Sequence, residues 1–204
     1  MYNIANVEFL TLSNNHLKAV PVGLELLKKL KYLDLSFQYW YSFQLNFGNK
    51  TNIEVLALDG LAIKKLDSYC QIAYIEENTF HGLTDLLLLD LSNNKNLKQI
   101  FSDTFLHLAS LAKVFIRNNP LLNNSIGALK FKNILTLDLS NCSLTSFPGT
   151  ISVIGIIENL NLYSNAINKL ESGNFNFKIK NLNLSHNRFE TMNSEMGDIL
   201  SKLQ

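Results

Sequence analysis

The sequence predicts an α/β solenoid rich in β-strand, with about eight turns and a parallel β-sheet on its concave face. Two observations carry this prediction. The pattern L-x-x-L-x-L-x-x-N-x-L occurs eight times, with copies starting near residues 7, 30, 53, 86, 111, 134, 157 and 179. The x-L-x-L-x alternation within each copy places leucines on one side of a short strand. Such short repeats bury their apolar side only by stacking on neighbours, so residues 1–204 are predicted to form a single domain.

Each copy is expected to supply one strand and one return segment. The third, fifth and seventh positions of successive strands should form columns of solvent-facing residues on the concave face. The return segments are bulkier than strands and should curve the stack into a horseshoe. The step from the third copy to the fourth is 33 residues, and the extra residues, about 67–77, are expected to form an inserted loop.

The ninth position of the pattern is expected to build a ladder of side-chain hydrogen bonds. Its asparagines are Asn15, Asn94, Asn119, Asn165 and Asn187. An amide can both donate to and accept from backbone groups that would otherwise be buried unpaired. Gln38 and Cys142 can still donate a hydrogen bond at the equivalent position, whereas Leu61 cannot. The ladder is therefore predicted to break at the third repeat.

These repeats resemble the leucine-rich repeat family over essentially the whole chain. The segment E-N-T-F-H-G-L at 77–83, which leads into L-D-L-S-N-N at 89–94, resembles the F-x-x-L repeats of animal extracellular receptors such as the Toll-like receptors. The V-P and F-P pairs at 20–21 and 147–148 resemble a second repeat type, found both outside cells and in cytosolic scaffolds.

The resemblance implies a module that recognises a protein or microbial ligand on the concave face. It favours part of an innate-immune or adhesion receptor, located extracellularly or at the cell surface. The alternative is a cytoplasmic scaffold or regulator of a signalling complex. Receptors of this family also carry Cys-rich caps, a signal peptide and a membrane helix. Their absence from this sequence leads us to expect a fragment of a longer protein.

Composition argues against other classes of function. A net charge of +1 offers no field to attract nucleic acid. No apolar run approaches the roughly 20 residues of a membrane helix. The two cysteines, Cys70 and Cys142, make neither a disulfide framework nor a metal site, and the four histidines show no metal-binding spacing. We therefore expect no enzyme activity, no cofactor and no metal, while the ligand and the oligomeric state stay open.

Six residues of the concave face are the candidate partner-binding site: Phe115, Arg117, Tyr163, His186, Asp90 and Asp138. Exposed aromatic residues and arginine dominate the binding energy of many interfaces. The alternative is that the aspartates belong to the family's usual L-D-L-S strand and are simply solvated, and that the aromatic residues are exposed singly.

Two further groups of residues have structural explanations. In the aromatic cluster at 37–47, Trp40, Phe43 and Phe47 occupy core positions of the pattern and are expected to fill the core. The alternative is that the cluster forms an aromatic edge that contacts a ligand. Four N-glycosylation sequons begin at Asn49, Asn123, Asn141 and Asn183, about as many as chance provides in a sequence with 27 asparagines.

Overall fold

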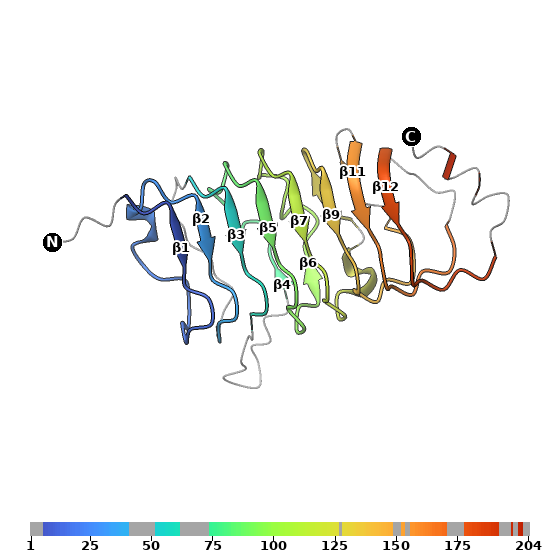
Figure 1. Cartoon of the computed structure of the whole chain (residues 1–204), viewed down its shortest axis with the longest axis horizontal. Helices are drawn as coiled ribbons and strands as arrows, with labels where there is room; N and C mark the ends of the chain where they lie inside the picture. The colour runs from blue at the N-terminus through green and yellow to red at the C-terminus, as the bar shows by residue number, and fades with distance from the viewer. Residues whose placement is uncertain are drawn as a thin grey trace.

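The computed structural model describes residues 6–40, 52–61, 74–126, 128–148, 152–153, 156–170, 178–191, 197 and 200–201. Within these residues, eight parallel strands form one sheet, and each strand comes from one of the predicted repeats. The strands are β1 (Phe9–Thr11), β2 (Tyr32–Asp34), β3 (Val55–Ala57), β5 (Leu88–Asp90), β7 (Lys113–Phe115), β9 (Thr136–Asp138), β11 (Ile156–Asn161) and β12 (Lys178–Asn183). They stand side by side in chain order along the long axis of the molecule (Figure 1). The predicted fold class is confirmed.

The inward side of the sheet forms a continuous row of apolar residues. Register pairs Leu33 with Leu56, and Leu56 with Leu89, and the same row continues through Val114 to Leu137. All five side chains are fully buried. Burying leucine-sized side chains contributes about 1.5–3 kcal/mol each. Since no repeat can bury its own leucines, the row ties the stability of each repeat to that of its neighbours.

The opposite side of the core is made by the return segments. They contain two short parallel pairs, β4 (Tyr74–Ile75) with β6 (Gln99–Ile100) and β8 (Lys130–Phe131) with β10 (Ser152–Val153), and the 3-10 helices η2 (Leu24–Leu26) and η3 (Asn123–Ile126). A stack of three phenylalanine rings runs through this layer, because Phe105 lies 6.2 Å from Phe80 and 5.2 Å from Phe131 between ring centroids.

Part of the predicted loop at 67–77 is a strand instead, because Ile75 is buried and β4 pairs with β6. Residues 67–73, which include Cys70, lie outside the described residues. Trp40 is fully buried, which confirms its predicted place in the core. Phe43, Phe47 and the sequon at Asn49 lie outside the described residues.

The fifth repeat departs from the sequence pattern. The pattern places Leu121 in the core, but Leu121 is exposed and Leu122 is buried instead. An extra residue follows the ninth position here, as it does in the fourth repeat, where Leu97 comes one place late. The tighter turn is closed within the repeat, because the backbone N–H of Leu122 donates to the carbonyl of Asn119 over 3.1 Å.

The eighth position of every repeat has a left-handed backbone conformation. These residues are Asn14, Phe37, Gly60, Asn93, Asn118, Asn141, Ser164 and His186, with φ between 53 and 60°. Asparagine and glycine tolerate this region best. The chain must turn here from the strand into the core, which explains a part of the high asparagine content that the ninth position alone does not explain.

Candidate functional site

The asparagine ladder holds the ends of the strands in place beneath the outer surface. Asn165 donates to the carbonyls of Leu139 and Leu162, both over 3.0 Å, and its Oδ1 accepts from the backbone N–H groups of Cys142 and Leu144, also over 3.0 Å. Asn94 and Asn187 bridge to their preceding repeats in the same way. Asn15, in the first repeat, donates only within its own turn. At Asn94, Asn165 and Asn187 the ladder therefore links a repeat to the one before it.

The tight turns of the fourth and fifth repeats change the hydrogen bonds at two ladder positions, Asn119 and Cys142. The N–H of Leu97 donates to the carbonyl of Asn94 over 2.8 Å, so the buried Oδ1 of Asn119 receives no hydrogen bond from a described residue. Asn119 still donates to the carbonyls of Leu91 and Ile116. The ninth residue of the next repeat is Cys142, and the N–H of Leu122 donates to the carbonyl of Asn119 instead of to this side chain. Cys142 donates to the carbonyl of Ile116 over 3.3 Å.

The other two exceptions are Gln38 and Leu61. Gln38 does more than the expected single donation, because its Oε1 also accepts from the N–H of Leu17 over 3.2 Å. Leu61 is buried at the ninth position and has no polar group to offer as a rung. Its backbone N–H, however, donates to Oδ1 of Asn94 over 3.0 Å, so the ladder resumes at the next repeat.

A second chain of side-chain hydrogen bonds runs along the eighth position. Asn141 donates to Asn118 over 2.9 Å, Asn118 donates to Asn93 over 2.8 Å, and Asn93 donates to the Asp59 carboxylate over 2.7 Å. The repeat pattern did not predict this row of hydrogen bonds along the eighth position. Its signal was present in the Asn-Asn pairs at 93–94 and 118–119, where the first residue of each pair belongs to the eighth position.

The outward side of the eight-stranded sheet, which we call the sheet face, presents the predicted columns. Register aligns Phe9, Tyr32, Val55, Leu88, Lys113, Thr136, Asn159 and Asn181 in the third-position column. It aligns Thr11, Asp34, Ala57, Asp90, Phe115, Asp138, Asn161 and Asn183 in the fifth-position column. Side chains far apart in sequence are therefore neighbours on one surface.

The aromatic and arginine candidates fall into two pairs. Tyr163 and His186 contact each other edge to face, with ring centroids 4.8 Å apart, and both are exposed. Phe115 is half-buried on β7, and Arg117 is exposed just beyond it. Strand β9 lies between the pairs in the sheet, and both its last residue, Asp138, and the following Ser140 are buried.

The aspartates of the sheet face differ in how many of their carboxylate oxygens accept hydrogen bonds. Both carboxylate oxygens of Asp138 are used: Oδ1 accepts from the backbone N–H and hydroxyl of Ser140, and Oδ2 accepts from Asn161 over 3.1 Å. In Asp34 and Asp90, one oxygen accepts from the N–H two residues later, over 2.9 Å in each case. No described residue donates to their second oxygens. Asp138 is thus part of the scaffold, while Asp34 and Asp90 retain a free oxygen.

Asp59 completes an acidic group with Asp34 and Asp90. Burial raises the pKa of the Asp59 carboxyl above 3.8, and the charges of Asp90 and Asp34 raise it further, although Asn93 and Arg117 act in the opposite direction. The pKa of Tyr32 is raised by burial and then by the charges of Asp34 and Asp90. The negative charges of Asp34 and Asp90 therefore act on both Asp59 and Tyr32.

A row of apolar side chains lies beside this acidic group, and the sequence analysis did not single it out. Phe9, Tyr32, Val55 and Leu88 follow one another across four adjacent strands. Phe9 is 70% exposed, the other three are half-buried, and the rings of Phe9 and Tyr32 lie 6.1 Å apart. The repeat pattern marked these positions as outward-facing but could not distinguish an apolar row from isolated exposed residues.

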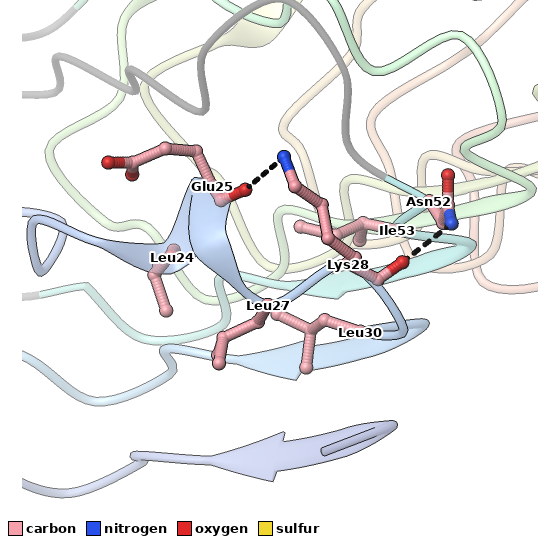
Figure 2. Close-up of a pocket in the computed structure, with 7 residues that line it drawn as sticks. All are labelled: Leu24, Glu25, Leu27, Lys28, Leu30, Asn52 and Ile53. Carbon is pink, nitrogen blue, oxygen red and sulfur yellow. Dashed lines mark hydrogen bonds between the residues drawn. The ribbon is translucent and has the colours of Figure 1, made fainter. Parts of the chain in front are cut away.

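The return side carries a cleft of about 330 Å³ beside η2 (Figure 2). It is lined by Leu24, Glu25, Leu27, Lys28, Leu30, Asn52 and Ile53. Its polar side chains are turned onto the backbone: the Lys28 ammonium donates to the Glu25 carbonyl over 3.0 Å, and Asn52 donates to the Lys28 carbonyl over 2.8 Å. These contacts stabilise the turn and give the cleft no charged group directed at a ligand.

The described residues contain no group of three or more His, Cys, Asp or Glu side chains placed to hold a metal ion. None of the helices in the described part of the chain has the length and hydropathy needed to cross a bilayer.

Comparison with known proteins identifies the repeats. Profiles described as leucine rich repeat match residues 68–121 and 133–153. Toll-like receptor 10 of Bos taurus is 30% identical over 167 residues, which cover 81% of this chain and 19% of that receptor. The chain thus spans about a fifth of the length of this curated relative. The chain therefore carries leucine-rich repeats that are similar to those of a Toll-like receptor, and this similarity supports a protein-interaction module.

Proposed function

We propose that this chain is a ligand-recognition segment of a receptor of innate-immune or adhesion type, and that it binds a protein or microbial ligand on the sheet face. The observation that carries the proposal is the sheet face itself. An all-parallel sheet normally has both faces covered, and here one face displays aromatic, apolar and charged side chains to solvent. Similarity to a Toll-like receptor supports the receptor type. In this proposal the chain binds and does not catalyse.

The residues proposed to contact the ligand include the two pairs on the sheet face. Tyr163 and His186 offer an aromatic pair at one end, and Phe115 and Arg117 offer an aromatic group and a cation near the middle. Asp90 and Asp138 remain in the proposed site with different roles. Asp90 keeps a free oxygen for the ligand, whereas Asp138 orders Ser140 and Asn161 at the boundary between the two pairs.

The test is a binding screen of the purified chain against secreted host proteins and microbial products. For any ligand found, the double variant Arg117→Ala/Tyr163→Ala is expected to bind about 30-fold more weakly, as hot-spot residues of these types do. The matched control is His107→Ala/Lys132→Ala, which removes two exposed side chains outside the sheet face. Equal affinity for the double variant and the control would refute the proposed site.

The extracellular location has its own test. Asn123 begins a sequon in the return segment and is exposed, so a glycan can be accommodated there without covering the sheet face. When the chain is directed through the secretory pathway of an animal cell, we expect a glycosidase-sensitive mass increase that Asn123→Gln reduces. A chain that stays unmodified, and that folds only in the reducing cytosol, would favour the cytoplasmic scaffold.

A further inference from the structure

The N-terminal half of the sheet face combines an apolar row with uncompensated negative charge. The apolar row is Phe9, Tyr32, Val55 and Leu88, on strands β1, β2, β3 and β5. Further along the same column the residue is Lys113, and the remaining positions are polar. The row therefore has a defined length of four strands. Four apolar side chains on adjacent strands form one contiguous strip, and a contiguous strip, unlike single exposed apolar residues, indicates an interaction surface.

The acidic group Asp34, Asp59 and Asp90 lies directly beside this strip. Asp34 and Asp90 are two residues further along the same strands as Tyr32 and Leu88, or roughly 6.6 Å away along the strand. None of the three carboxylates lies within ion-pair distance of a described lysine or arginine. Each accepts one hydrogen bond from a described residue, and its second oxygen accepts none. Arg117 and Lys113 on the next repeat mark the end of the acidic surface.

The dimensions of this surface fit an α-helix laid across the strands. Neighbouring strands lie about 4.8 Å apart, close to the 5.4 Å rise of one helical turn, so apolar side chains at i, i+3, i+7 and i+10 would meet successive strands. Four strands span about 14 Å, or roughly ten helical residues. An extended peptide places residues of one face about 6.6 Å apart, which does not match the strand spacing. Helices are also the elements that usually cover a parallel sheet.

We propose that strands β1, β2, β3 and β5 of the sheet face form a docking surface for a basic amphipathic helix of the partner. Its apolar side packs on Phe9, Tyr32, Val55 and Leu88, and lysine or arginine residues on one flank bind the free oxygens of Asp34, Asp59 and Asp90. This inference rests on the proposed function and specifies the chemistry of the partner. Charge complementarity determines which flank of the helix faces the aspartates, and the apolar strip supplies the apolar surface that is buried on binding.

The experiment uses the full chain and a synthetic helix of about 14 residues, with leucines on one face, lysines on one flank and alanine elsewhere. Wild type is expected to bind it with an affinity that falls as salt is added. Asp34→Asn/Asp90→Asn should weaken binding about tenfold, since each exposed charge pair contributes modestly. Both asparagines keep the oxygen that accepts from the N–H two residues later, so the fold is retained. The matched control is Asp85→Asn, an exposed aspartate outside the columns.

Two peptide controls separate helix recognition from charge alone. The same peptide with glutamates in place of the lysines should not bind. A peptide of the same composition, scrambled so that no apolar face forms, should bind at least about tenfold more weakly. Equal binding of the scrambled peptide, equal binding by Asp34→Asn/Asp90→Asn, or no binding of the basic helix would each overturn the inference.

These outcomes are distinguishable from failure of the proposed function. If a natural ligand depends on Arg117 and Tyr163 while the basic helix does not bind, the receptor proposal stands and the helix inference fails. If the basic helix binds in the expected way and no natural ligand responds to the sheet-face variants, the helix inference stands and the receptor proposal fails.

Discussion

Replacing Asn165 by leucine tests the energetic role of the ladder. The substitution keeps the approximate size of the side chain but removes both halves of the amide. It leaves the backbone N–H groups of Cys142 and Leu144 buried without their acceptor, and both residues are at most 1% exposed. An unsatisfied buried polar group costs about 1–3 kcal/mol, so the two donors together cost about 2–6 kcal/mol. We expect a loss of this order in the free energy of unfolding.

Asn119→Leu is the matched control. Asn119 is fully buried and donates to two carbonyls, as Asn165 does, but its Oδ1 accepts from no described donor. The leucine therefore leaves no N–H group without an acceptor, and the apolar gain is the same in both variants. We expect Asn165→Leu to be at least about 2 kcal/mol less stable than Asn119→Leu. Urea midpoints at unchanged m-value give the comparison. Equal losses, or a larger loss for Asn119→Leu, would refute this account.

Three further predictions concern Asp59, Cys142 and Gly60. The folded-state pKa of Asp59 is raised, so the protonated carboxyl stabilises the fold fully below about pH 3.8, and this stabilisation is lost as pH rises through the folded pKa. In thermal melts, Asp59→Asn should therefore be more stable than wild type at pH 7 and equal to it near pH 3. Burial raises the pKa of the Cys142 thiol to about 12, so in a Cys70→Ser background an alkylating reagent at pH 8 should label it only after denaturation, and rapid native labelling would contradict its burial. A Cβ on Gly60 would lie 2.5 Å from the Phe37 ring, at a φ of 59°; Gly60→Ala should therefore destabilise wild type clearly more than a Phe37→Asn variant, and additive losses in a double-mutant cycle would argue against the contact.

The repeated part of the fold follows from the sequence because each strand obeys the same local rule. The x-L-x-L-x alternation assigns Leu33, Leu56 and Leu89 to the core and the intervening residues to the sheet face, and the register of the sheet agrees with these assignments. The pattern assigns the wrong buried residue where the length of a repeat changes, not where its composition changes. One extra residue after Asn119 moves the buried position from Leu121 to Leu122, which a template of fixed spacing cannot anticipate.

The candidate site is less accessible to sequence reasoning, because it depends on which hydrogen bonds remain unused. Asp90 and Asp138 occupy the same position in the pattern and cannot be told apart in sequence. Only the structure shows that Asn161 occupies the second oxygen of Asp138, while that of Asp90 has no described donor. The apolar row is likewise visible only when residues about 23 positions apart are seen as neighbours.

Under the proposed function, the ligand contacts the sheet face. A photo-crosslinking amino acid at Lys113, on the third-position column, tests it directly. Lys132 is the matched control, because it is an exposed lysine of the same repeat that follows β8 in the return segment. With a ligand found by screening, the account predicts efficient crosslinking from position 113 and little from position 132. Crosslinking from position 132 alone would show that the ligand binds outside the sheet face and would contradict the account.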